Sequence, residues 1–360
     1  MRLFTLTVSA TIAIGLLAAC ASSNSGSPSL PAPAGAQVRF APLGLALPLM
    51  PQAGVGRLHL ATRIVRSATT AGIYGSNLYA YQLWGYSNPN KSNNKPVCTL
   101  GSKTSPLTFV NGFGTDPNRN VMVPWFLHYS SQYLGEISVY KPNCGGRLWE
   151  APDANGQPGD AYSSNPATGK VIVAELQLRT AKTGAVAICS FKAECGKAFS
   201  NKAVTGIGIG VAAAANGDCW LSAATTATSG FVLVYFKGCA GSGQVATGTS
   251  DAAAGGLFID TMGRLGSIDQ AGELYVYKGC NPACTLVKSS PLEGQPIIGG
   301  LNAKGNQLAL GDYATNAVDI YTYNATTGAA TYSYSFNDGL TSGSENQVEA
   351  GLFAPRNGKV

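Results

Sequence analysis

The sequence predicts an all-β fold assembled from repeated units of four short antiparallel strands. Only 12% of the 360 residues are charged, whereas 45% are hydrophobic and 45 residues are glycine. Glycine is unfavourable inside helices, and the charged residues that usually cover helix surfaces are scarce. The hydrophobic fraction is large enough for a core, which excludes a disordered, collagen-like or coiled-coil chain. Many short strands joined by glycine-rich turns fit this composition.

A strand that ends in tyrosine recurs along the chain and defines the repeat. Its copies lie about 42 to 59 residues apart, and the third is a diverged copy that ends in cysteine. The copies are residues 78–81, 137–140, 186–189, 232–235, 274–277 and 318–321. Four strands per unit with this period indicate a β-propeller.

A second strand precedes most of these copies by about half a repeat. It begins at a turn that contains glycine or asparagine, and it often ends in an acidic residue. Residues 169–175, 263–269 and 305–312 follow this pattern, and residues 217–222 follow it without the acid. We expect these segments to be the second strands of four blades.

The innermost strand of a blade is expected to be rich in glycine and alanine because it packs near a crowded axis. Residues 206–212 have this composition, and the chain ends on a similar stretch, residues 351–360. The first unit lacks such a strand. We therefore expect the C-terminal segment to complete the first blade and to close a ring of six blades; the alternative is seven blades, with residues 57–65 forming part of the additional one.

The turn, the Gly-Asn-like pair, the strand and the acidic residue of each unit resemble the repeat of NHL-type and related six-bladed propellers. The resemblance covers roughly residues 57–360. It implies the propeller architecture but no particular activity, because propellers support many functions.

The N-terminal residues resemble the signal peptide of a bacterial lipoprotein. Arg2 supplies a positive charge, residues 3–19 carry none, and Leu-Ala-Ala precedes Cys20. The resemblance implies cleavage before Cys20 and lipidation of that residue, with several acyl chains that anchor the protein stably in a membrane. Ala21, in place of aspartate, implies an outer-membrane destination if the cell has two membranes. The alternatives are an ordinary secretory peptide or a membrane anchor, for which the apolar run is short.

Three segments are expected to precede the propeller. Residues 1–19 form the signal peptide. Residues 20–36 contain the lipidated cysteine and a flexible tether, since they are rich in Ser, Pro, Ala and Gly. Residues 37–56 are apolar and interrupted by proline, which excludes a helix, so we expect them to be extended against the domain. The propeller then spans residues 57–360.

Eight cysteines follow Cys20, and an even number in an exported chain predicts disulfides. Eight cysteines allow 105 pairings. Cys189 with Cys195, and Cys280 with Cys284, each span the turn after a third strand, so each pair is expected to bridge its own outer hairpin. Zinc is disfavoured because these short pairs lie far apart in the sequence. The alternative is that some of the thiols are simply small buried side chains.

The remaining four cysteines predict two longer bridges. Cys219 and Cys239 lie on successive strands of one blade, with their midpoint beside Gly230, so we expect them to face one another across a hairpin. Elimination leaves Cys98 with Cys144, which would join neighbouring blades.

Three acidic residues stand at equivalent places in the repeat, at the ends of second strands. Glu175, Asp269 and Asp312 are therefore expected at one rim of the central channel. Convergent carboxylates can bind a divalent cation or act as an acid and base pair. Gluconolactonase-like six-bladed enzymes use a channel-mouth metal, but their ligand pattern is not found in this sequence. The alternative is that these acids accept hydrogen bonds from backbone N–H groups of the next turn.

An aromatic cluster occupies the corresponding position in the second blade. Trp125, His128 and Tyr129 are expected on a rim loop, where aromatic rings suit the stacking of a sugar or peptide. The alternative is a loop that packs its rings on the neighbouring blade.

Other motifs do not support a function. Residues 208–213 match a loose dinucleotide-binding pattern, but the acidic residue that should follow is absent, so an inner strand explains them better. Residues 116–127 begin like a calcium loop and then depart from its pattern, which favours a structural turn. No G-x-S-x-G motif occurs. The net charge of +6 contains no basic run, so nucleic-acid binding is not predicted.

The function that fits these features is a membrane-tethered, exported and non-catalytic propeller that binds an envelope partner or an extracellular protein, peptide or carbohydrate at its rim. One alternative is a channel-mouth, metal-dependent lactonase or lyase that uses Glu175, Asp269 and Asp312. Another is a purely structural envelope component. No cofactor is expected, apart from a divalent cation at the channel mouth in the enzyme alternative.

Overall fold

The computed structural model shows an all-β protein. The chain divides into two units, residues 1–58 and residues 59–360. The structure describes residues 71–77, 82–87, 95–101, 112–115, 118–129, 132–165, 170–178, 183–190, 195–225, 230–249, 255–269, 271–312, 314–337 and 348–353. The predicted signal peptide, Cys20, the tether and the proline-rich segment lie outside these residues. Within the described ranges, no helix is long and apolar enough to cross a membrane.

The strands form antiparallel sheets, each of which we name by its innermost strand. The β23 sheet contains β23 (Val348–Phe353), β1 (Ile73–Asn77), β2 (Gln82–Tyr86) and β3 (Cys98–Leu100). The β4 sheet contains β4 (Gly114–Thr115), β5 (Val121–Tyr129), β6 (Gln132–Tyr140) and β7 (Arg147–Asp153). The β8 sheet contains β8 (Gly156–Asn165), β9 (Lys170–Leu178) and β10 (Ala185–Ser190).

The C-terminal half of the chain continues the same order. The β11 sheet contains β11 (Gly208–Ala213), β12 (Cys219–Thr225), β13 (Gly230–Phe236) and β14 (Gln244–Val245), with a 3₁₀ turn, η1 (Lys237–Cys239), after β13. The β15 sheet contains β15 (Leu257–Ile259), β16 (Leu265–Ile268), β17 (Glu273–Lys278) and β18 (Thr285–Pro291). The β19 sheet contains β19 (Pro296–Leu301), β20 (Gln307–Asp312), β21 (Ala317–Asn324) and β22 (Ala329–Phe336).

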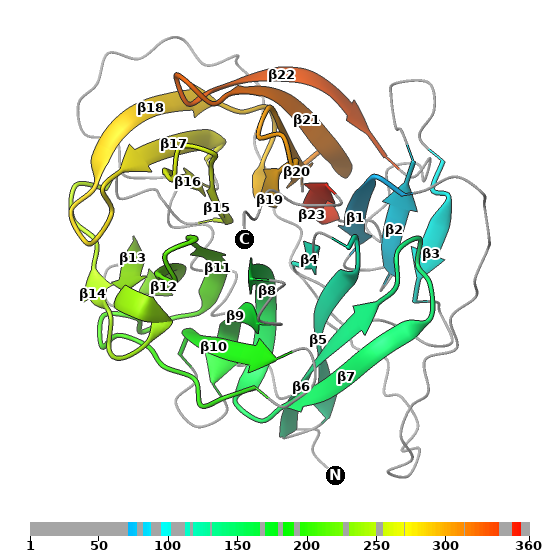
Figure 1. Cartoon of the computed structure of the whole chain (residues 1–360), viewed down its shortest axis with the longest axis horizontal. Helices are drawn as coiled ribbons and strands as arrows, with labels where there is room; N and C mark the ends of the chain where they lie inside the picture. The colour runs from blue at the N-terminus through cyan, green and yellow to red at the C-terminus, as the bar shows by residue number, and fades with distance from the viewer. Residues whose placement is uncertain are drawn as a thin grey trace, which may run out of the picture. The chain divides into compact units, whose positions relative to one another are not determined.

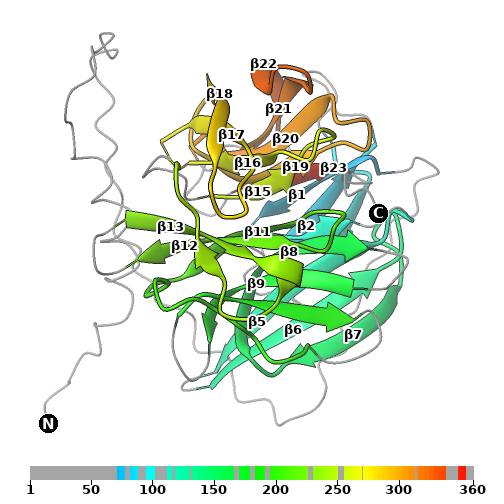
Figure 2. The ribbon, with the colours of Figure 1, turned by 60° about the vertical axis from the view of Figure 1, so that its left-hand side comes forward.

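The sheets are arranged around a common centre, so the fold is a β-propeller (Figure 1). Each innermost strand contacts the next one: β23 contacts β4, and β8, β11, β15 and β19 follow in turn, until β19 contacts β23 again. A second view shows the sheets stacked face to face, with β15, β16 and β17 next to β19 and β20 (Figure 2). The innermost strands therefore form a closed cycle of contacts, in which the sheets follow one another in their order along the chain.

The C-terminal strand closes the ring, as the sequence predicts. β23 pairs antiparallel with β1 and in parallel with β19, so the β19 and β23 sheets join into one eight-stranded sheet. The backbone N–H of Ala350 also donates to Ser76 Oγ at 3.0 Å, a contact between residues that are 274 positions apart in sequence. The first and last strands of the propeller are therefore bound to each other by backbone and side-chain hydrogen bonds.

Apolar side chains fill the space between successive sheets. Tyr74 and Leu83 of the β23 sheet pack with Val121 and Tyr140 of the β4 sheet in one buried cluster. Equivalent clusters lie between the other neighbouring sheets. At Gly210 of β11 there is no room for a side chain, because a Cβ atom there would lie 2.5 Å from the carbonyl oxygen of Gly255. This close approach explains why the inner strands are rich in glycine.

Most of the predicted strands are found. The second strands expected at residues 169–175, 217–222, 263–269 and 305–312 are β9, β12, β16 and β20, and the inner strand at 206–212 is β11.

The first tyrosine strand was placed wrongly. Asn77 pairs with Gln82, so residues 78–81 connect β1 to β2 and lie outside the described residues. The strand equivalent to the other tyrosine strands is β2, which ends in Tyr86. Both segments carry apolar and aromatic residues before a tyrosine, and only the pairing across the hairpin distinguishes them.

Candidate functional site

The three predicted rim acids each lie near the end of the second strand of a sheet. Glu175 is in β9, where its backbone pairs with Pro158 and Ala185. Asp269 follows β16 directly, and Asp312 is the last residue of β20. All three side chains are buried, with exposed fractions of 0% for Glu175, 2% for Asp269 and 0% for Asp312. None of them is presented to solvent.

Asp269 and Asp312 hold the turns that follow their strands. Asp269 Oδ1 accepts a hydrogen bond from the backbone N–H of Glu273 at 2.7 Å. Asp312 Oδ1 accepts from the N–H groups of Gln295, Ala314 and Thr315 at 3.1, 2.7 and 3.2 Å. The sequence left two interpretations of these acids open, a catalytic or cation-binding role and hydrogen bonding to backbone N–H groups of the next turn. The geometry of Asp269 and Asp312 matches the second interpretation.

Glu175 has a different environment, because its neighbour is another carboxyl group. Asp153, the last residue of β7, lies within hydrogen-bonding reach of Glu175, and the exposed fractions are 1% and 0%. Burial raises the pKa of Glu175 well above its usual range, and the charge of Asp153 raises it further. Two carboxylates at this distance repel one another when both are ionised. The pair therefore holds a proton or requires a positive charge.

A second carboxyl pair lies in the β19 sheet, between Asp312 and Asp319 of β21. Burial, together with the neighbouring carboxylate of Asp312 and a smaller effect of Glu293, raises the pKa of Asp319 from 3.8 to about 8. Tyr321 lies within hydrogen-bonding reach of Asp319 and partly offsets this rise. The phenol of Tyr321 also accepts a hydrogen bond from the backbone N–H of Glu293 at 2.9 Å. Asp319 is thus kept neutral well above the usual range of an aspartate.

The three predicted acids do not gather around one point. Glu175 is paired with Asp153, and Asp312 is paired with Asp319, while Asp269 serves its own turn. In the ranges that the structure describes, no three His, Cys, Asp or Glu side chains are grouped so that they could hold a metal ion. The convergence that the enzyme alternative requires is not seen for these residues.

The aromatic cluster lies on a strand and not on a loop. Trp125, His128 and Tyr129 belong to β5, and their backbones pair with Glu136, Tyr133 and Gln132 of β6. The pairing of the two strands continues to Tyr129 and Gln132, beside the turn of the hairpin. The side chains of the three residues lie outside the described part of the structure. The expected loop was wrong because the register of this long hairpin extends to the residues beside its turn.

Sequence reasoning missed a set of acids in the turns between first and second strands, at the other end of the sheets. Asp260 accepts hydrogen bonds from Arg264 Nε at 2.7 Å and from the phenol of Tyr323, on the next sheet, at 2.9 Å. Asp218 accepts from the phenol of Tyr235 at 2.9 Å and from the N–H of Gly238 at 2.7 Å. An aspartate near a turn glycine and a repeated tyrosine are the signals that could have revealed these contacts.

Four disulfides form in the structure, and they are the pairs predicted from the sequence. They join Cys98 with Cys144, Cys189 with Cys195, Cys219 with Cys239, and Cys280 with Cys284. Disulfides persist in oxidising compartments, so the chain is an exported protein.

The two longer bridges differ in how well their geometry was predicted. The bond between Cys98 of β3 and Cys144 joins neighbouring sheets, as expected. The register expected for Cys219 was wrong, because it faces Phe236 across the ladder, and Cys239 lies three residues further on in η1. The bridge therefore closes a turn beyond the end of the ladder.

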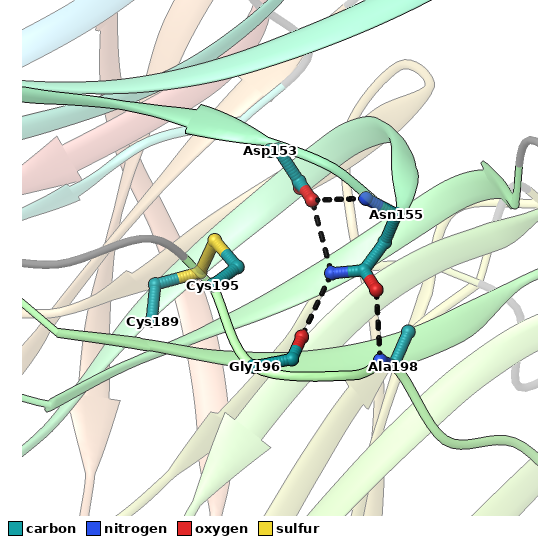
Figure 3. Close-up of a disulfide and its surroundings, with 6 residues drawn as sticks. All are labelled: Asp153, Asn155, Cys189, Cys195, Gly196 and Ala198. Carbon is teal, nitrogen blue, oxygen red and sulfur yellow. Dashed lines mark hydrogen bonds between the residues drawn. A yellow bond between two sulfur atoms is a disulfide. The ribbon is translucent and has the colours of Figure 1, made fainter.

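Asn155 connects Asp153, the neighbour of Glu175, to the outer edge of the β8 sheet (Figure 3). Asp153 Oδ1 accepts hydrogen bonds from both the backbone N–H and Nδ2 of Asn155, at 2.9 and 3.0 Å. The Asn155 side chain in turn donates to Gly196 O and accepts from Ala198 N, both at 2.9 Å. The 189–195 disulfide lies beside these contacts. A single amide thus holds the segment that follows β10 to the preceding sheet.

Known structures resemble this chain in fold. No protein-family model matches the sequence, and no curated protein matches it. A periplasmic gluconolactonase of Pseudomonas aeruginosa superposes with a TM-score of 0.52 at 12% identity, over 76% of this chain and 85% of that one. A chain from the crystal structure of a nidogen/laminin complex superposes with a TM-score of 0.52 at 10% identity, over 79% of this chain and 98% of that one. At these identities the likeness concerns the fold alone.

Proposed function

We propose that the protein is a non-catalytic β-propeller of a bacterial envelope, anchored by lipid at Cys20, which binds an envelope partner or an extracellular protein, peptide or carbohydrate. The observation that carries the proposal is that Asp269 and Asp312 accept hydrogen bonds from the backbone of the turns that follow their strands. Residues committed to such contacts brace the blades and are not free for acid and base chemistry. The ring then acts as a rigid support for a binding surface.

We also propose that the ring has six blades. The cycle of inner-strand contacts from β23 through β4, β8, β11, β15 and β19 supports this number. The fourth position of the β8 sheet is supported by an isolated bridge, in which Val186 and Phe199 exchange backbone hydrogen bonds at 2.8 and 2.9 Å.

The proposed binding surface is the end of the β5–β6 hairpin. Trp125, His128 and Tyr129 are the candidate contact residues, since aromatic rings stack well on sugars and peptides. The hairpin extends the second and third strands of its sheet to nine residues each. The corresponding strands of the β15 sheet, β16 and β17, have four and six residues.

A lactonase is the second candidate, favoured by the fold likeness to a periplasmic gluconolactonase. It would need Glu175 to act on a substrate, yet that carboxyl has an exposed fraction of 0%. A purely structural envelope component is the third candidate, and the braced turns are compatible with it.

One set of assays on the purified chain separates the three candidates. We expect peptidoglycan fragments or short peptides to raise the melting temperature of the wild-type protein, and Trp125→Ala to remove that rise while leaving the melting temperature of the free protein nearly unchanged. Tyr332→Ala, an exposed aromatic on the outer strand β22, is the matched control. Gluconolactone hydrolysis above the buffer rate that is lost in Glu175→Gln would instead establish the lactonase. If no ligand raises the melting temperature and gluconolactone is not hydrolysed, the result would favour the structural envelope component.

The lipid anchor is tested separately. Cys20→Ser is expected to release the protein from membrane fractions or to block its processing. A variant that is processed and still fractionates with membranes would contradict the anchor.

A further inference from the structure

Three carboxylate oxygens without a hydrogen-bond donor face one another between the β4 and β8 sheets. They are both oxygens of Glu175 and Oδ2 of Asp153, and all three are buried. The other oxygen of Asp153 is used by Asn155. Buried polar atoms are almost always paired in folded proteins, so this cluster of unpaired oxygens requires an explanation.

The described side chains supply no counter-charge for this pair. The ion pairs in the described ranges join Arg147 to Glu150 and Arg264 to Asp260. Among the described residues, the charge that shifts the pKa of Glu175 is that of Asp153, and it has the same sign. A buried carboxylate that lacks a partner costs several kcal/mol of folding free energy. A ligand that carries positive charge would remove this cost.

The second carboxyl pair has more donors than the first, although Asp312 Oδ2 and Asp319 Oδ2 are also buried without one. Asp312 Oδ1 accepts three backbone N–H groups, and a methyl group on Gly294 would overlap Asp312 Oδ2, so backbone fills the space beside that oxygen. Tyr321 is within hydrogen-bonding reach of Asp319. Glu175 has no such donors. Glu175 and Asp312 stand at the same end of second strands, but of the four carboxyls only Glu175 lacks a hydrogen-bond donor on both of its oxygens.

We propose that Glu175 and Asp153 bind a hard divalent cation, such as Ca²⁺, between the β4 and β8 sheets. Carboxylate oxygens, bound in one- or two-oxygen mode, are the ligands that Ca²⁺ prefers, and backbone carbonyl groups and water complete its shell in proteins. The cation would be structural, since both carboxyls are shielded from solvent. Through Asp153 and Asn155 it would also fix Gly196 and Ala198, and with them the outer edge of the β8 sheet.

The test measures cation binding and stability in the purified full-length chain. After treatment with EDTA, CaCl₂ is added stepwise at pH 7.5 while the melting temperature is recorded. A saturable rise of about 5 °C is expected at a hundredfold excess over Kd. The rise should be absent in Glu175→Gln and preserved in Glu293→Gln, which alters an exposed glutamate. Tb³⁺ luminescence, excited through tryptophan, gives a second readout that does not depend on stability.

Each other outcome contradicts the inference. If neither Ca²⁺ nor EDTA changes the melting temperature and no Tb³⁺ luminescence is seen, the two carboxyls share only a proton. A Ca²⁺ response that is lost in Asp319→Asn and kept in Glu175→Gln would place the cation at the other carboxyl pair. If Glu175→Gln does not fold, Asp153→Asn replaces it, and the Tb³⁺ titration of the wild-type protein still decides whether a cation binds. The site is independent of the proposed partner binding at Trp125.

Discussion

Replacing Asp319 by asparagine is expected to remove much of the pH dependence of stability. The pKa of this buried carboxyl rises from 3.8 to about 8 because of burial and the neighbouring Asp312, with Glu293 adding a smaller effect and Tyr321 opposing it. The folded chain therefore binds more protons than the unfolded chain between these values, and stability falls as pH rises across that range. Its contribution is fully present below about pH 4 and lost by about pH 8.

The size of the effect follows from the same values. At about 1.4 kcal/mol per pKa unit, the rise sets an upper limit of roughly 6 kcal/mol. Relaxation and water entry reduce the penalty for charging a buried group, so we expect a loss of about 2–4 kcal/mol between pH 5 and pH 8.

Denaturant unfolding at pH 5, 6, 7 and 8 measures this loss in the wild-type protein and in Asp319→Asn, with the disulfides intact. Other buried acids also contribute to the wild-type slope, and the difference between the two proteins isolates Asp319. Between pH 5 and pH 8, the free energy of unfolding of Asp319→Asn should fall by about 2–4 kcal/mol less than that of the wild-type protein. Equal slopes for the two proteins would refute the assignment of a raised pKa to this residue.

Three further perturbations test the packing of the propeller. Gly351→Ala places a Cβ atom 2.6 Å from Val318 Cγ1, and we expect a loss of about 1–3 kcal/mol by denaturant unfolding, while Gly146→Ala, with open space around it, should change little. Trp220→Phe removes the 2.7 Å hydrogen bond from Nε1 to Cys280 O between the β11 and β15 sheets, which should cost about 1–3 kcal/mol because the carbonyl stays buried. The double replacement Cys219→Ser and Cys239→Ser should lose about 3 kcal/mol, and non-reducing peptide mapping that joined Cys219 to any other cysteine would contradict the pairing.

The repeat made much of the fold predictable. A turn glycine, a short apolar strand and a terminal acid located β9, β16 and β20, because each blade uses the same local geometry. The inner strand at the C-terminus could be matched to the first blade because the first unit lacked one. The two short disulfides could be predicted because each pair of cysteines flanks one turn, and the two longer ones followed from a hairpin and from elimination.

The site was less predictable because its chemistry depends on contacts between sheets. Asp153 is 22 positions before Glu175 and stands at the end of an outer strand, so nothing in the repeat relates the two residues. Asp319 lies inside a third strand, where its burial beside Asp312 depends on the hairpin register. The pairing of Glu175 with Asp153, and of Asp312 with Asp319, could not be predicted from the repeat because it depends on how neighbouring strands pack.

The closure of the ring by β23 is the central structural claim, and hydrogen exchange measured by mass spectrometry tests it most directly. Residues 348–353 pair with β1 on one side and with β19 on the other. Their amides should therefore exchange as slowly as those of β1, and only through unfolding of the whole propeller. Exchange of residues 348–353 at the rate of an unstructured peptide, while β1 stays protected, would contradict a ring closed by the C-terminal strand.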